Sequence, residues 1–157
     1  MSNEASKPSV ITKEMRDYIG KELEPCVFEI EAGAIKKLAK AVGDPNPLWQ
    51  DRAYARKTEY GDIIASPTFV AAMRPESIAV LFSLECPLFG ILDAGIEIEY
   101  GEPIKPGDVL TGIPKLADVQ ERQGKSGNPM LFMTLETAYK NQKGKMAVIT
   151  RQTIIRR

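Results

Sequence analysis

Residues 66–84 read SPTFVAAMRPESIAVLFSL, and this apolar stretch decides the fold. Apolar side chains recur on nearly every side of a helix here, which predicts a buried helix over 67–84. Pro67 stands at a first-turn position, where its missing N–H costs nothing, whereas Pro75 is expected to interrupt the helix. Phe82 is then a core residue, and its replacement by Ala is expected to cost about 3–5 kcal/mol of stability.

After residue 92 the pattern changes to strict alternation, which is typical of strands with one buried face. The first such run sets three apolar residues, Ile96, Ile98 and Tyr100, opposite Glu97 and Glu99. The predicted strands lie near residues 93–104, 108–121, 130–141 and 145–156. One buried helix against an antiparallel meander is an α+β architecture, and it leaves apolar surface that a second subunit would cover.

Shorter elements are predicted upstream of this core. Thr12 can cap a short helix over 12–19, and alternation over 24–30 predicts a strand at an edge of the sheet or added to it. Helical spacing over 32–42 predicts a further helix that ends at Gly43. Asp51 is expected to cap another short helix.

The composition is that of one soluble globular domain, with 157 residues, 43% hydrophobic and 27% charged. Lysine plus arginine (21) equals aspartate plus glutamate (21), so no net field favours nucleic acid or a membrane surface. The longest apolar runs have five residues, far short of the roughly 20 that span a bilayer. The first ten residues lack the pattern of a secretion signal and are expected to be frayed, which predicts a cytoplasmic protein with Cys26 and Cys86 as buried thiols. Residues 1–19 are expected to be a polar extension and 20–157 the domain.

The chain contains no histidine. This absence excludes Ser-His-Asp and Cys-His nucleophile systems and zinc sites with histidine ligands. Two cysteines cannot form a structural zinc site either, so no metal is expected. Any chemistry would use carboxylates, tyrosine, lysine or backbone dipoles.

Three segments together resemble a known family. They read GDPNPLWQDRAYA (43–55), YGDIIASPTF (60–69) and EPIKPGDVL (102–110), in this order after a strand and a helix. The order is similar to that of the MaoC-like hot-dog proteins, which include the (R)-specific enoyl-CoA hydratases and related dehydratases. The resemblance covers roughly residues 20–157, and the PTF form of the central helix start is more similar to the dehydratase N-terminal branch. It implies a hot-dog fold, in which an antiparallel sheet wraps around a long central helix.

The hydratase loop of that family reads D-x-N-P-x-H-x-D, and its Asp and His position a water for addition to the enoyl thioester. Asp44, Asn46, Pro47 and Asp51 match this motif, but the histidine position is Trp49. An indole N–H donates a hydrogen bond and does not exchange a proton at working pH. The resemblance therefore implies a site without its acid/base pair.

The start of the central helix departs from the family as well. Ser66 stands at the position of the family's second histidine. Pro67, which has no N–H, stands at the position of the glycine whose N–H holds the thioester oxygen in the family. Ser66 and Thr68 either offer a hydroxyl and an N–H to a thioester carbonyl, or Ser66 simply caps the helix.

The other candidate site residues have two readings each. Asp44 is either a turn residue bonded to its own backbone or, if the chain is active, the catalytic base. Asn46 beside it is a candidate substrate-binding residue. Trp49 either plugs the emptied pocket or stacks on substrate. Tyr54 and Tyr60 are supports or ligand contacts. Five basic residues either meet coenzyme A phosphates or form a solvated face: Arg122, Lys125, Arg151, Arg156 and Arg157.

Three functions follow from these patterns. The favoured one is a hot-dog subunit of an enoyl-CoA hydratase or 3-hydroxyacyl-thioester dehydratase that lacks its own acid/base pair and helps a catalytic partner bind the acyl thioester. The others are an active hydratase or dehydratase using Asp44, and a homodimeric acyl-CoA-binding protein. All three predict a second hot-dog subunit, identical or a histidine-bearing MaoC-like protein, and a coenzyme A thioester as substrate or ligand, with no cofactor.

Overall fold

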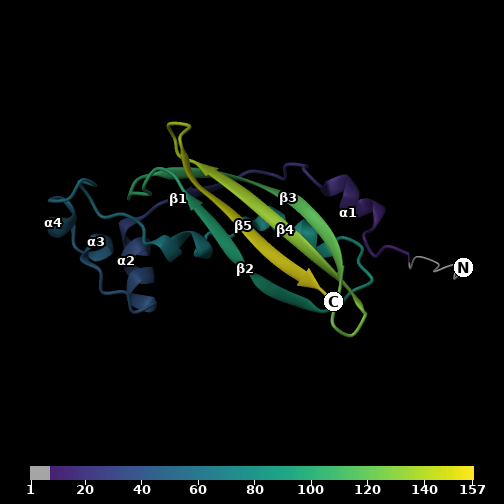
Figure 1. Ribbon diagram of the computed structural model, residues 1–157. Coiled ribbons are helices and arrows are strands. Elements are labelled where there is room, and N and C mark those ends of the chain that lie inside the picture. The colour runs from purple at the N-terminus through teal and green to yellow at the C-terminus, as the bar shows by residue number, and fades with distance from the viewer. Residues whose placement is uncertain (1–7) are drawn as a thin grey trace, which may run out of the picture.

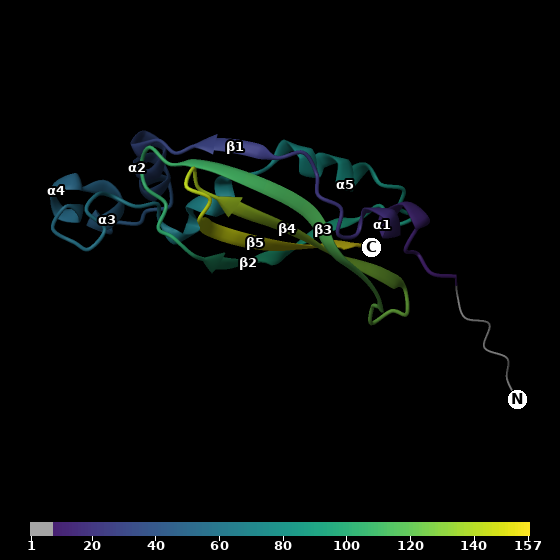
Figure 2. The ribbon, with the colours of Figure 1, turned by 90° about the horizontal axis from the view of Figure 1, so that it is seen from above.

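The computed structural model describes residues 8–157 as a strongly curved sheet with helices on its inner side and at one end (Figures 1 and 2). All strand pairs are antiparallel, and the strand order is β1-β3-β4-β5-β2. The strands are β1 (Cys26–Glu29), β2 (Ile91–Tyr100), β3 (Val109–Gln123), β4 (Pro129–Lys140) and β5 (Met146–Arg156). The predicted α+β hot-dog architecture is confirmed, and the strand predicted over 24–30 is an edge strand.

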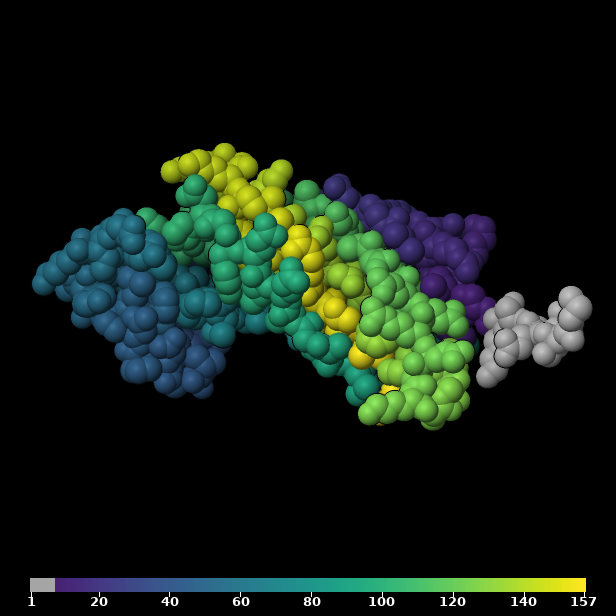
Figure 3. Space-filling model, in the orientation of Figure 1, coloured from purple at the N-terminus to yellow at the C-terminus, as the bar shows by residue number. Residues whose placement is uncertain are grey.

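Of the four helices described before the central segment, all but the third form where the sequence predicts them. They are α1 (Lys13–Tyr18), α2 (Ala32–Ala41), α3 (Pro47–Gln50) and α4 (Arg52–Ala55). Thr12 caps α1, because its hydroxyl accepts a hydrogen bond from the Met15 N–H at 3.2 Å. Figure 3 shows the segment that carries α2, α3 and α4 as a lobe beyond one end of the sheet. The expected frayed start falls mostly on residues 1–7, which lie outside the described part of the chain.

The core lies between the inner face of the sheet and the central segment. Along β4, every second residue from Leu131 to Tyr139 is buried, as strict alternation predicts. The same alternation places Ile96, Ile98 and Tyr100 of β2 on the inner side and Glu97 and Glu99 on the outer side, but β2 remains largely exposed. The inner side of this edge strand is thus apolar surface that the chain itself leaves uncovered.

The central segment is interrupted as the sequence predicts, but it is only partly α-helical. It consists of two 3-10 turns and a short helix: η1 (Pro67–Ala72), η2 (Glu76–Ile78) and α5 (Ala79–Ser83). Pro75 causes the break, because it has no N–H to donate and disfavours helical backbone at Arg74 before it. Met73 is already extended, with φ −85° and ψ 97°. The interruption predicted at Pro75 is correct, but the predicted helical geometry is found only in α5, since the segments 67–72 and 76–78 are 3-10 turns.

Phe82 is also a correction, because 38% of its surface is exposed in this chain whereas Leu81 beside it is 1% exposed. Apolar residues on all sides of a short helix cannot all face one sheet, and Phe82 is on the outer side. The loss for Phe82→Ala is therefore revised to about 1 kcal/mol, against about 2–5 kcal/mol for Leu81→Ala. Urea unfolding of the two variants checks this order, and an equal loss would contradict it.

Two smaller expectations also change. β2 ends at Tyr100 rather than at residue 104, because Pro103 cannot donate to the neighbouring strand. Cys26 and Cys86 are free thiols, but both are half-buried rather than buried. No helix within residues 8–157 is long and apolar enough to cross a membrane.

The outer face of the sheet carries a cluster of charges that spans four strands. Arg151 contacts Glu136 at 2.7 Å, Glu97 at 3.1 Å and Glu99 at 3.2 Å, and Lys115 contacts Glu136 at 2.9 Å. The hydrogen bond from Lys115, together with that from Arg151, lowers the pKa of the Glu136 carboxyl, although partial burial opposes the shift. These contacts give Arg151 a role in holding the strands of the sheet together, which is the alternative to the expectation that it binds coenzyme A phosphates.

This cluster predicts a specific loss of acid stability. A lowered folded-state pKa means that Glu136 stabilises the fold above its ordinary pKa of 4.5 and that this contribution disappears as the pH falls through the folded value. Glu136→Gln is expected to lower stability at pH 7 and to flatten the fall in stability below about pH 4.5. Denaturant titrations from pH 7 to about pH 3 measure this, with Glu59→Gln, an exposed site outside the cluster, as the control. If stability fell at acid pH as steeply in Glu136→Gln as in the wild type, Glu136 would not be the source of the acid sensitivity.

Candidate functional site

The loop that follows α2 is held by its own polar side chains. Gly43 adopts a φ of 70°, which ends α2 and turns the chain into the Asp-Pro-Asn-Pro sequence. The Asp44 Oδ1 accepts a hydrogen bond from the Asn46 N–H at 3.0 Å, and the Asn46 Oδ1 accepts one from the Leu48 N–H at 2.9 Å. Asn46 therefore caps α3 rather than reaching into a cavity.

Trp49 binds the second oxygen of the same carboxylate. The Trp49 indole Nε1–H donates to Asp44 Oδ2 at 2.8 Å, and the Gln50 side-chain amide donates to the Asp44 carbonyl at 2.6 Å. Both carboxylate oxygens of Asp44 thus accept hydrogen bonds from within the loop. The reading of Asp44 as a turn residue is supported, and its Oδ2 accepts from an indole N–H, which donates a hydrogen bond but takes up no proton at neutral pH.

A cavity of about 300 Å³ opens beside this loop, between the start of η1 and the end of β2. Trp49 and Ser66 line it, together with Tyr60, Pro67 and Val70. The other sequence candidates do not line it: Asp44, Asn46, Tyr54 and Thr68. Trp49 therefore lines the cavity while its indole N–H donates to the Asp44 carboxylate.

Tyr54 and Asp51 serve other roles. Tyr54 is 48% exposed on α4 and away from the cavity lining, so the structure does not bring it to this site. Asp51 is confirmed as a helix cap, because its Oδ1 accepts hydrogen bonds from the Ala53 N–H at 2.8 Å and the Tyr54 N–H at 3.1 Å.

Ser66 corrects an expectation about the start of the central segment. It occupies the cap position of η1, but its side chain makes no capping hydrogen bond; its Oγ lies 3.4 Å from the Thr68 Oγ1. Ser66 is buried, and it lines the cavity with its neighbour Pro67. A 3-10 turn with proline in its first position leaves the serine hydroxyl facing a side chain instead of a backbone N–H.

Tyr100 belongs to the cavity, although the sequence placed it only on the inner side of a strand. Its hydroxyl donates a hydrogen bond to the Pro67 carbonyl, which ties the end of β2 to the start of η1. Burial raises the pKa of Tyr100, so this hydroxyl stays protonated at neutral pH. The sequence contained a signal for this contact: Tyr100 follows two isoleucines on the inner side of the strand, and a tyrosine hydroxyl at such a position needs a hydrogen-bond partner.

The cavity contains few groups that could move a proton. Glu102 supplies its carboxylate, but this side chain is exposed and lies 3.5 Å from the Lys145 ammonium. The other ionisable side chains among its lining residues are those of Tyr60 and Tyr100. Within residues 8–157 no cluster of acidic or cysteine side chains could hold a metal ion. The arrangement suits binding of an uncharged group better than acid/base chemistry.

The five basic residues considered for phosphate binding do not gather at this cavity. Arg151 is in the outer-face cluster, Arg156 donates to the Leu88 carbonyl at 3.1 Å, and Arg122 lies over the Phe132 ring at 4.7 Å. Lys125 and Arg157 line a separate cavity of about 630 Å³ beside the turn between β3 and β4.

Solved structures with this fold define the class. The chain is similar to the MaoC-like dehydratase from Rhodospirillum rubrum, with 26% identity and a TM-score of 0.66 over 88% of this chain and 93% of that one. It also superposes on the HadBC (3R-hydroxyacyl-ACP dehydratase) complex from Mycobacterium tuberculosis, with a TM-score of 0.75 over 88% of this chain and 97% of that one, but the identity of 20% shows the fold alone. The fold is that of the hot-dog hydratases and dehydratases.

Sequence similarity assigns the chain to a family within this class. The model of the FAS1-like dehydratase domain region matches residues 17–150, and the chain belongs to this family. Among curated relatives it is 32% identical over 127 residues to a UPF0336 protein of Thermobifida fusca, which covers 78% of this chain and 82% of that protein. The predicted resemblance to the MaoC-like hot-dog proteins and their dehydratase branch is thereby confirmed.

Proposed function

We propose that this chain is a non-catalytic hot-dog subunit of a cytoplasmic enoyl-CoA hydratase or 3-hydroxyacyl-thioester dehydratase. In this role it binds part of a coenzyme A thioester beside a partner that supplies the acid/base pair. The hydrogen bond of 2.8 Å from Trp49 to Asp44 is the observation that carries the proposal. It occupies the carboxylate with a donor that cannot take up a proton, where the hydratases have a histidine.

The thioester pocket supports the same conclusion. Stabilising an enolate oxygen takes N–H donors aimed at the oxygen, and Pro67 supplies none at the position where the family has glycine. The cavity of about 300 Å³ nevertheless persists beside it. A subunit that shapes an acyl site without performing the proton transfers needs the cavity but not these groups.

The edge strand β2 indicates where a partner binds. It is ten residues long and exposed, with Ile96 and Tyr100 on its inner side, whereas the opposite edge strand β1 has four residues. Long unpaired edges with apolar neighbours are templates for another strand. We expect a second hot-dog subunit to cover β2, burying on the order of 1,200–2,000 Å² in total. Two of the similar structures are themselves complexes, HadBC and ChsH1-ChsH2 from Mycobacterium tuberculosis.

Co-purification tests the partner. The tagged chain, isolated from its native source, is expected to bring down a second protein with the D-x-N-P-x-H-x-D loop, identified by mass spectrometry. Recovery of the chain alone, as a homodimer, would instead favour the acyl-CoA-binding reading.

A charge on the edge strand is expected to disrupt the assembly. Leu92 is a partly exposed residue of β2, and Leu92→Lys would place an ammonium group in the interface. We expect association to weaken about tenfold or more, read as a shift toward monomer mass in light scattering at micromolar concentration. Val42→Lys, at an exposed apolar site beyond α2, is the control and should leave the mass unchanged. Wild-type protein that stays monomeric both alone and in the presence of its partner would contradict the interface.

A further inference from the structure

The inner face of the sheet is polar at one place. Thr137 of β4 and Thr150 of β5 are direct cross-strand partners, and both are buried, at 5% and 7% exposure. Gln152, two residues along β5, shares their face. A face that only packed against the central segment would carry apolar residues here, because burying hydroxyl and amide groups costs free energy unless they are bonded.

A bulge adds a carboxylate to this polar patch. The register of β2 shifts between Asp93 and Ile96, so both side chains lie on the inner face although three positions separate them. The Asp93 Oδ2 accepts a hydrogen bond from the Gln152 amide at 2.9 Å, and Oδ1 accepts one from the Gly95 N–H at 3.0 Å. Gly95 has a φ of 115°, which only glycine adopts readily. Bulges commonly redirect a side chain toward a functional site.

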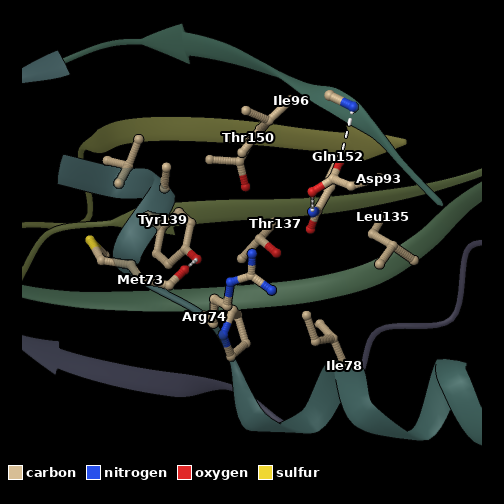
Figure 4. A pocket seen from close by; sticks show the side chains of 14 residues that line it. Met73, Arg74, Ile78, Asp93, Ile96, Leu135, Thr137, Tyr139, Thr150 and Gln152 are labelled. Carbon is tan, nitrogen blue, oxygen red and sulfur yellow. Dashed lines mark hydrogen bonds between the residues drawn. The ribbon is translucent and has the colours of Figure 1, made fainter. Parts of the chain in front are cut away.

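These polar groups line a cavity of about 270 Å³ between the sheet and the central segment (Figure 4). Arg74, between η1 and η2, lines it from the opposite side, and its guanidinium extends toward the strands near Thr137. Within residues 8–157, Arg74 has neither an ion pair nor a side-chain hydrogen bond. Val70 lines both this cavity and the one at Trp49, so the two adjoin across one side chain.

We propose that this second cavity receives the remote part of the acyl group and selects an acyl chain that carries a hydroxyl group far from the thioester. The inference rests on the proposed acyl-binding function and specifies its substrate class. A hydroxyl both donates and accepts, so it can accept from the Arg74 guanidinium while donating to Asp93. A plain hydrocarbon would offer no partner to the Arg74 guanidinium, which lines the cavity without an ion pair or a side-chain hydrogen bond among the described residues.

Matched ligands test the selection. The purified chain is titrated by calorimetry with saturated acyl-CoA thioesters of several lengths and with the ω-hydroxyacyl-CoA of each length. Saturated chains cannot be hydrated, so binding is measured without turnover. We expect at least one ω-hydroxy member to bind about 10- to 100-fold more tightly than its plain counterpart, the range for a hydrogen bond to a charged group.

Variants locate the effect. Arg74→Met and Thr150→Val keep the approximate shape of each side chain and remove its polar group, so each is expected to abolish most of the preference while leaving plain acyl-CoA affinity within about threefold. Arg122→Met, at the Phe132 ring and outside the lining of this cavity, is the matched control and should keep the preference.

The outcomes separate the two proposals. Equal affinity for plain and hydroxylated chains at every length would overturn the substrate class but leave acyl-thioester binding intact. A preference that survives both cavity variants would overturn the site. Failure of every acyl-CoA to bind, both to the chain alone and to its complex with the partner, would refute the proposed function itself.

Discussion

Purified alone, the chain is expected to show no hydration of enoyl-CoA, and activity should appear only when a histidine-bearing hot-dog partner is added. Loss of one positioned acid/base group costs about 10²–10⁴ in rate, and here the histidine is absent while the remaining carboxylate is bonded to Trp49. Loss of absorbance of the conjugated thioester measures the reaction. In the reconstituted complex, Asp44→Asn should keep activity within about twofold, because the partner carries the protons.

Restoring the family residue should not restore the enzyme. Trp49→His places an imidazole five positions after Asp44, but Pro67 still withholds an N–H, a loss that costs about 10²–10³ in rate. Trp49→Phe is the control for loss of the Asp44 hydrogen bond without a new base. Robust activity from the unmodified chain, or a drop of several hundredfold for Asp44→Asn in the complex, would instead establish the alternative in which Asp44 is the working base.

Two glycine-to-alanine substitutions are expected to change stability in opposite directions. A methyl group at Gly112 would lie 2.6 Å from Tyr139 Cε1 and 2.9 Å from the Cys26 Sγ. Tyr139 cannot easily move, since it is fully buried and its hydroxyl donates to the Met73 carbonyl at 3.1 Å. Overpacking of this kind costs about 1–3 kcal/mol.

Gly33 provides the matched comparison. It lies within α2, and a methyl group added there would meet no atom within 4 Å apart from its chain neighbours and the backbone of its own helix. Its φ is not positive, so alanine fits the backbone without strain. Gly33→Ala should therefore stabilise the protein by about 0.4–1 kcal/mol. At about 2–4 °C per kcal/mol, thermal unfolding separates the two variants clearly. A Gly112→Ala protein as stable as wild type would show that Tyr139 is free to move.

The sequence predicted the elements whose signals are local. Alternation along β4 and β5, the Thr12 and Asp51 caps and the end of α2 at Gly43 all depend on residues within a few positions of one another. The α-helical geometry expected on both sides of Pro75 was only partly right, because local apolar content cannot show how two prolines divide a segment among 3-10 and α geometry. The exposure of Phe82 depends on which side of α5 meets the sheet, which is a tertiary property.

The candidate site was predicted in part. Motif spacing brought Trp49 and Ser66 to one cavity, and the two readings of Asp44 included the observed turn. Tyr54 and Thr68 were placed there by proximity in sequence alone, and they do not line it. Tyr100 was missed as a site residue, because its contact with the Pro67 carbonyl joins segments 33 positions apart.

Trp49 is the only tryptophan in the chain, and it stands in the wall of the cavity. Its emission therefore originates from the site alone, with no second indole to subtract. A ligand that displaces solvent from the ring, or loosens the bond to Asp44, changes the polarity around the fluorophore. Occupancy of this cavity can thus be followed optically in the unlabelled wild-type protein, in a mixture with any partner that itself lacks tryptophan.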